Sequence, residues 1–278
     1  MTTMDVATPE DCELFVRTEQ AQIIRSVVEL LKDLVFEATF VFSPTGIKVS
    51  SMDSSKSSLV YLKLDAAAFE DFHVTREHQV GVSLQLLYKL VKIASSSDTI
   101  AFFVRKQSTH ELGIHIENTE THNRTVFSLK MLDLNTANIT LPPLEFDYMV
   151  QLNSATFQRL IRDMQNLAPF VTISTTGNGL VLSCSGDFAQ QTTTIGAAED
   201  ITEGTPEATP ELTPITEGAA KPPPFSSTYS LKYLSLFSKS STLSSSLSMY
   251  LRRDHPLTLD FAAGSLGSII FLLSPLDE

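Results

Sequence analysis

The feature that most constrains this chain is an internal repeat. Residues 22–35 carry apolar side chains at helical spacing, and two strand-like runs follow them around a turn at residues 43–46. This order, a helix and then a hairpin, starts again about 130 positions later, where residues 31–33 return as residues 161–163. A unit repeated as a whole predicts two similar domains in one chain.

A second helix is expected at residues 83–94, and residues 230–239 echo it in the second half of the chain. Strands predominate between the helices of the first half. They are expected at residues 38–42, 47–51, 59–64, 99–105, 111–117 and 125–132. The fold class is therefore α+β.

The composition also suggests domain boundaries. The first domain is expected to end before residue 133. Paired prolines at residues 142 and 143 favour an extended connector over residues 133–147, because proline cannot donate to a sheet ladder. Residues 148–278 are expected to form the second domain. It includes an acidic, proline-rich loop at residues 199–224, which has too few apolar residues to offset the cost of ordering it.

The 278 residues supply enough apolar material for large cores, with 42% hydrophobic residues and 17 Phe. The net charge of −12 argues against simple wrapping of the chain around phosphates, so a nucleic-acid site would have to be a segregated basic surface. Cys12 and Cys184 are the only cysteines, which excludes a disulfide framework and fits a reducing compartment. We expect neither a secretory signal nor a membrane span.

Each of the four predicted helices carries two basic residues on the side away from its apolar residues. Members of a pair that are seven or three positions apart lie roughly 20° or 60° apart around the helix axis and so face one way. The eight residues are Arg25, Lys32, Lys89, Lys92, Arg159, Arg162, Lys232 and Lys239.

For one helix alone, an ordinary solvated face would explain the basic pair. Glu29 stands between Arg25 and Lys32, where it can form common helix pairs. Four helices that share the arrangement in a chain of net charge −12 concentrate positive potential on one surface. The pattern favours a surface that faces phosphates.

Residues 51–60, which begin with Ser51-Met52-Asp53, closely resemble the signature of the proliferating cell nuclear antigen family. Further motifs of that family occur in the expected order at residues 31–34, 132–134, 159–163 and 231–234. The resemblance covers residues 13–275, apart from much of the acidic loop. It implies an N-terminal domain at residues 13–132 that follows an extension at residues 1–12.

This resemblance implies a DNA clamp fold, with two topologically similar domains that each pack two helices on antiparallel sheets. Three such subunits would form a ring around duplex DNA, with all eight basic residues facing the DNA. The ring would act as a polymerase processivity factor and would dock polymerase, clamp loader and repair proteins. No cofactor is implied. The expected location is the nucleus, or a viral replication site for a virus-encoded chain.

The family's partner-peptide pocket, carried over by position, would use Met52, Leu59, Ile139, Leu141, Pro142, Pro256, Leu272 and Pro275. Leu272 replaces the usual tyrosine, which leaves partner preference open. Gly177 stands where the family has a ubiquitin-acceptor lysine. Subunit contacts would join edge strands around residues 126–130 and 186–191, with Phe127, Gly186 and Phe188 as interface residues.

The sequence gives catalysis little support. His110 and His115 are five positions apart in a strand-like run, so they do not form the helical zinc motif that they superficially resemble. We find no phosphate loop, nucleophile elbow or paired-carboxylate arrangement. A non-enzymatic replication clamp is favoured. The alternatives are a subunit of a heteromeric, checkpoint-type clamp and, more remotely, a nuclease or metal hydrolase.

Overall fold

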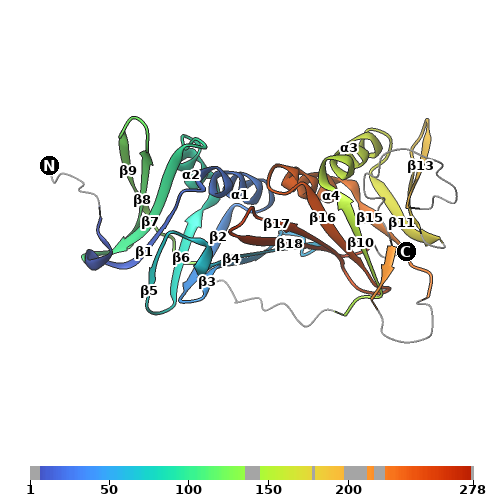
Figure 1. Ribbon diagram of the computed structural model, residues 1–278. Coiled ribbons are helices and arrows are strands. Elements are labelled where there is room, and N and C mark those ends of the chain that lie inside the picture. The colour runs from blue at the N-terminus through green and yellow to red at the C-terminus, as the bar shows by residue number, and fades with distance from the viewer. Residues whose placement is uncertain (1–6, 135–144, 177–178, 197–211, 216–222, 277–278) are drawn as a thin grey trace. The chain divides into compact units, whose positions relative to one another are not determined.

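The computed structural model describes residues 7–134, 145–176, 179–196, 212–215 and 223–276. Their contacts divide the chain into two compact units (Figure 1). Unit 1 takes its described residues from Met1–Ser54, Val60–Thr140 and Ala262–Ile269, and unit 2 from Ser55–Leu59, Leu141–Phe261 and Ile270–Glu278. The domain boundaries expected from the sequence stay a prediction.

Unit 1 contains two α-helices among its described residues. In chain order its elements are η1 (Pro9–Asp11), β1 (Cys12–Thr18), α1 (Ala21–Leu34), β2 (Glu37–Ser43), β3 (Gly46–Met52), β4 (Ser58–Asp65), η2 (Ala66–Ala68), β5 (Asp71–Val74), β6 (His78–Ser83), α2 (Leu84–Val91), β7 (Asp98–Arg105), β8 (Ser108–Asn118) and β9 (Arg124–Lys130). The sequence analysis missed β1, β5 and β6.

The strands of unit 1 run in the orders β5-β1-β7-β8-β9 and β4-β3-β2-β6. Helix α1 packs against α2 and β7, and α2 packs against β2 and β6. The apolar residues at helical spacing in α1, Ile24, Val27, Val28 and Leu31, are all buried. Their burial explains why the amphipathic segment folds onto a sheet.

Unit 2 repeats this plan. Its elements are β10 (Tyr148–Asn153), α3 (Ser154–Gln165), β11 (Phe170–Thr176), β12 (Gly179–Ser185), β13 (Gln190–Ile195), β14 (Leu212–Pro214), β15 (Ser226–Ser230), α4 (Leu231–Ser238), η3 (Lys239–Thr242), β16 (Ser246–Leu251), β17 (Leu257–Ala262) and β18 (Gly267–Leu273). The first residues of β18 belong to unit 1.

The strands of unit 2 run in the orders β13-β12-β11-β15 and β14-β10-β16-β17-β18. Helix α3 packs against α4. It begins at an N-cap, where the Asn153 side chain accepts a hydrogen bond of 3.0 Å from the Thr156 backbone N–H. Within the segment expected to be an acidic loop, residues 212–214 form the short edge strand β14, and Leu212 buries its side chain there.

The outer face of the five-stranded sheet in unit 1 has a small core of its own. Phe103 lies over Gly113 on the neighbouring strand, where an added Cβ would fall 2.2 Å from the ring. Ala7, Phe15 and Ala101 complete the cluster together with Cys12. Part of the N-terminal extension is therefore integral to unit 1.

One arginine fastens the two helices of unit 1 to each other. Arg25, on α1, donates a hydrogen bond of 3.2 Å from Nη1 to the carbonyl oxygen of Ala94, which lies just beyond α2. Its Nε is buried without a hydrogen-bond partner in the described part of the chain. A cation at the carbonyl end of a helix also interacts favourably with the helix dipole.

Replacing Arg25 with methionine, which keeps much of the apolar stem, should destabilise the protein by about 1–3 kcal/mol, because it removes a charged hydrogen-bond donor. The measurement is urea unfolding at fixed protein concentration. Arg159→Met is the matched control. The exposed position of Arg159 predicts a change within about 0.5 kcal/mol. Equal stability of the two variants would show that Arg25 does not fasten the helices.

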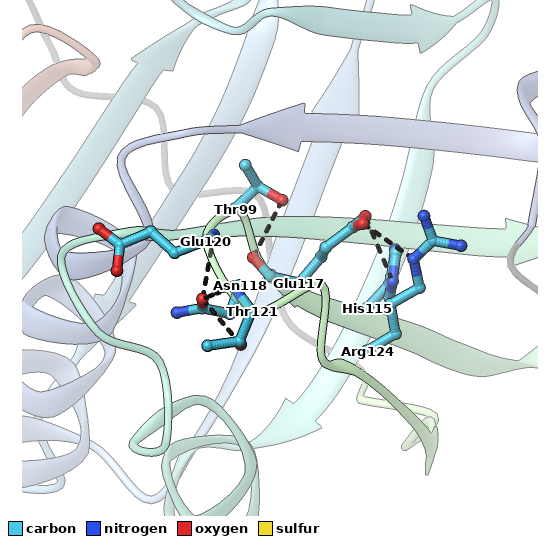
Figure 2. A network of polar contacts seen from close by, with 7 residues as sticks. All are labelled: Thr99, His115, Glu117, Asn118, Glu120, Thr121 and Arg124. Atoms are coloured by element: carbon cyan, nitrogen blue, oxygen red, sulfur yellow. Dashed lines mark hydrogen bonds and ion pairs between the residues drawn. The ribbon is translucent and has the colours of Figure 1, made fainter.

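Unit 1 also holds two histidines beside ion pairs, of which His115 is buried and His78 is half-buried. His115 Nε2 lies 4.0 Å from Glu117 Oε2, while Arg124 Nε donates to Glu117 at 2.8 Å across β8 and β9 (Figure 2). His78 Nδ1 lies 3.9 Å from Glu13, which Arg76 already binds at 3.0 Å.

Burial, aided by Arg124 and Arg17 and opposed by Glu117, holds the pKa of His115 below its ordinary value of 6.5. Burial and Arg76 likewise lower the pKa of His78 against the opposing effect of Glu13. The unfolded chain therefore binds protons at a higher pH than the folded chain does. Stability is lost as the pH falls through about 6.5 toward the folded-state values.

His115→Gln should reduce this loss of stability between about pH 7 and pH 5, because glutamine cannot take up the proton. The measurement is the urea midpoint as a function of pH. His110→Gln, which replaces an exposed histidine on the same strand, is the control. An unchanged pH profile in the His115 variant would exclude this residue as a source of acid sensitivity.

Candidate nucleic-acid interface

The eight predicted basic residues lie on or next to the helices in both units. Figure 1 shows α1 beside α2 in unit 1 and α3 beside α4 in unit 2, as their contacts also indicate. The structure therefore brings the residues together in two groups of four. Unit 1 contributes Arg25, Lys32, Lys89 and Lys92, and unit 2 contributes Arg159, Arg162, Lys232 and Lys239.

The two cations of α1 are engaged in contacts within unit 1. Arg25 binds the Ala94 carbonyl oxygen, as described above. Lys32 Nζ forms an ion pair of 2.7 Å with Asp33 and lies 4.7 Å from the centroid of the Tyr88 ring. The Tyr88 hydroxyl donates at 2.8 Å to Glu29, and this bond raises the pKa of Tyr88. The contribution of Tyr88 was not predicted from the sequence, and the structure pairs Glu29 with Tyr88.

Lys89 and Lys92 are exposed, and the described residues offer neither of them an ion-pair partner. Lys92 lies one residue beyond α2, so the expected helix was slightly too long. Its backbone nevertheless stays helical, and its N–H donates to the carbonyl oxygen of Tyr88. Leu86 and Ile93 near these lysines are 49% and 50% exposed, so this face of unit 1 is partly apolar.

The four predicted basic residues of unit 2 are all exposed. Arg159 and Arg162 project from α3, and no hydrogen bond or ion pair joins either of them to another residue in the described ranges. Lys232, on α4, lies 5.7 Å from the Tyr233 ring centroid. Lys239, the last residue of the expected helical segment, is the first residue of η3, one position beyond α4. The exposure of these side chains is what the predicted phosphate-facing surface requires.

The predicted partner-peptide pocket is described only in part. Ile139, Leu141 and Pro142 lie outside the described residues. In unit 2, Leu59 and Leu272 are buried, while Pro256 and Pro275 are half-buried. The Ser274 N–H donates to the Ser57 carbonyl oxygen at 2.9 Å, which ties the ends of two pocket segments together. Met52, in unit 1, is 44% exposed and available for contact.

The predicted interface strands are edge strands. β9 ends the order β5-β1-β7-β8-β9, and β13 ends the order β13-β12-β11-β15. Phe127 is half-buried opposite Ile114 on β8, whereas Phe188 in the turn before β13 is 77% exposed. An apolar ring this exposed beside an open edge suits an interface.

The local backbone geometry explains why residue 186 is a glycine. A Cβ at this position would fall 1.8 Å from the carbonyl oxygen of Leu167, so the close approach of two backbones requires glycine there. Its N–H donates to the Ala189 carbonyl oxygen at 2.9 Å and closes the turn that carries Phe188. Gly186 is therefore a residue that shapes this edge.

At the β9 edge, the loop between β8 and β9 is held by side chains (Figure 2). Asn118 Oδ1 accepts hydrogen bonds from the backbone N–H groups of Glu120 and Thr121, and Asn118 Nδ2 donates to Asp98 at 2.6 Å. Together with the Glu117–Arg124 pair, these contacts fix the register of the edge strand.

Within the described ranges, no three His, Cys, Asp or Glu residues are grouped so that they could hold a metal ion. His110 and His115 both lie on β8, but one is exposed and the other is buried. A helix long and apolar enough to cross a membrane is also absent from these ranges.

The matches to known proteins cover nearly the whole chain. Residues 14–138 match the N-terminal domain of proliferating cell nuclear antigen, and residues 140–276 match its C-terminal domain. A probable DNA polymerase sliding clamp of Paramecium bursaria Chlorella virus 1 is 32% identical over 272 residues, which cover 96% of this chain and 98% of the viral protein.

A second relative is the proliferating cell nuclear antigen of Chaetomium thermophilum. It is 29% identical over 259 residues, which cover 93% of this chain and 96% of the fungal protein. The two domain matches follow one another along the chain, as the internal repeat predicts. The chain therefore belongs to the proliferating cell nuclear antigen family of DNA polymerase sliding clamps.

Proposed function

We propose that three copies of this chain form a ring around duplex DNA, where the ring serves as a processivity factor for DNA polymerase. One observation carries this proposal. Each unit has exposed basic residues beside its paired helices, although the net charge of the chain is −12. Cations segregated in this way contact phosphates without reading bases, so the binding is independent of sequence.

The edge strands support closure of the ring. A head-to-tail contact joins two different surfaces, here the β9 edge of one copy and the β13 edge of the next. Such a contact gives a ring when the rotation between copies closes. The exposed Phe188 supplies apolar area at the β13 end of this contact.

The ring also acts as a docking platform without catalytic activity of its own. Polymerase, clamp loader and repair proteins insert a short peptide into the pocket carried over from the family. No cofactor or metal takes part. The ring works in the nucleus, or at a viral replication site if a virus encodes the chain.

Light scattering should give three times the chain mass of 30.6 kDa, and Phe188→Asp should shift the protein toward monomer. Truncating a buried interface anchor commonly costs over ~1 kcal/mol. Phe36→Asp is the matched control, because Phe36 is also 77% exposed but lies away from the edge strands. A parent that stays monomeric at micromolar concentrations would exclude the ring, and a mass reached only with other clamp chains would indicate the checkpoint-type heteromer.

The same assembly should be trapped on circular DNA after loading and should be released when the circle is cut. A ring holds DNA by topology, so its retention depends on the absence of DNA ends. Retention that is equal on linear and circular DNA would contradict encirclement.

Ile139→Ala and Leu141→Ala should each weaken binding of a polymerase-derived clamp-binding peptide at least about fivefold, because truncated anchors commonly cost over ~1 kcal/mol. Calorimetry measures the affinity, and light scattering confirms that the trimer is intact. Ile93→Ala, an exposed apolar residue outside the pocket, is the control. Unchanged affinity in both pocket variants would place the peptide site elsewhere.

A further inference from the structure

The internal repeat allows α1 and α3 to be compared position by position. Residues 31–33 correspond to residues 161–163, so Lys32 corresponds to Arg162. Three positions earlier, Glu29 of α1 corresponds to Arg159 of α3. The burial patterns agree with this alignment, because the pairs 27 and 157, 30 and 160, and 31 and 161 are all buried.

Equivalent positions therefore carry opposite charges in the two units. The face of α1 presents an exposed carboxylate, Glu29, where α3 presents the exposed guanidinium of Arg159. Phosphate is attracted to the second and repelled by the first. The repeated helices are thus not equivalent as phosphate-binding surfaces.

Contacts within unit 1 strengthen this difference. Asp33, at 2.7 Å, and the Tyr88 ring hold Lys32, and only 20% of the Lys32 side chain is exposed. The corresponding Arg162 is exposed. The repeat also places Ser235 of α4 where α2 has Tyr88, so unit 2 has no aromatic ring at that position.

Arg25 has no cationic counterpart in unit 2, because the repeat places Ala155 at that position. Its guanidinium binds the Ala94 carbonyl oxygen, and its Nε is buried. One donor of Arg25 is thus bound inside the fold and another is buried, so fewer of its five N–H donors can reach a phosphate than in an exposed arginine. Arg25 is therefore a positioning residue for the α1–α2 pair.

We propose that the two units hold DNA unequally: Arg159 and Arg162 of unit 2 supply the main phosphate contacts, whereas Arg25 and Lys32 of unit 1 serve the fold. Lys89 and Lys92 remain as the exposed cations of the unit 1 helix pair, beside the apolar Leu86 and Ile93. This inference rests on the proposed DNA-encircling function and adds to it which residues bind the phosphates.

The test compares two substitutions that remove the same charge from equivalent positions. Arg162→Ala should weaken binding of the assembled protein to a short fluorescent duplex about threefold or more at low salt, and should flatten the salt dependence by about 0.9 for each phosphate that is no longer neutralised. Lys32→Ala should change the affinity less than about twofold, because its charge is already paired. Fluorescence anisotropy over a salt series measures both effects, and light scattering and urea unfolding confirm assembly and folding.

A third variant tests the charge difference by changing α1 so that it resembles α3. Glu29→Arg gives α1 the residue that α3 carries and should strengthen duplex binding about twofold or more at low salt. Weaker or unchanged binding by this variant would overturn the proposal, since Glu29 would then not limit the phosphate affinity of unit 1.

The remaining outcomes separate this inference from the function on which it rests. An equal drop in affinity for Arg162→Ala and Lys32→Ala would show that total charge alone matters, which overturns the unequal contribution and leaves the clamp function standing. Unchanged affinity in both variants while the parent binds would place the phosphate contacts on other residues and would also overturn the inference. A parent that neither assembles nor is retained on circular DNA would remove the proposed function, and the inference with it.

Discussion

The arrangement of charge in this protein depends on the burial of one apolar stripe on each helix. In α1 the buried residues Ile24, Val27 and Leu31 turn one side of the helix to the sheet, and the arc away from them includes Arg25, Glu29 and Lys32. Burying a large aliphatic side chain contributes about 1.5–3 kcal/mol, whereas an exposed charge contributes little. The hydrophobic side therefore determines the orientation, and the charged side is free to vary with function.

The same constraint explains which parts of the fold could be predicted. Helix faces and hairpins follow from periods of 3.6 and 2, and the repeat supplies their order twice. Strand β1 was missed because it is buried on both faces: Leu14 and Val16 face one side, while Phe15 faces the outer cluster with Phe103. Burial on both faces removes the alternation of apolar and polar residues that identifies a strand.

The positions of the basic residues in the candidate site could be predicted from the sequence. Which of these residues are already bound to other groups of the protein could not. The eight basic residues were identified from spacing, and unit 2 presents its four exposed. The spacing of residues along a helix does not show a hydrogen-bond partner that is far away in the sequence. Arg25 binds the carbonyl oxygen of a residue 69 positions away, and Glu29 accepts a hydrogen bond from one 59 positions away. Only Lys32 and Asp33 are neighbours in the chain, and there the pairing is visible in the sequence.

A net charge of −12 and a surface for phosphates are compatible because of the range over which charges act. At physiological salt the screening length is about 8 Å, so a phosphate close to α3 responds chiefly to Arg159 and Arg162, whereas distant acids act weakly. The excess of acids is expected to keep the affinity for linear duplex low. Such weak contacts would suit the proposed ring, because each contact would break easily as the ring slides while its closure would prevent escape. In that proposal the exposed guanidinium groups of α3 would guide the duplex, and the edges around β9 and Phe188 would determine how long it is held.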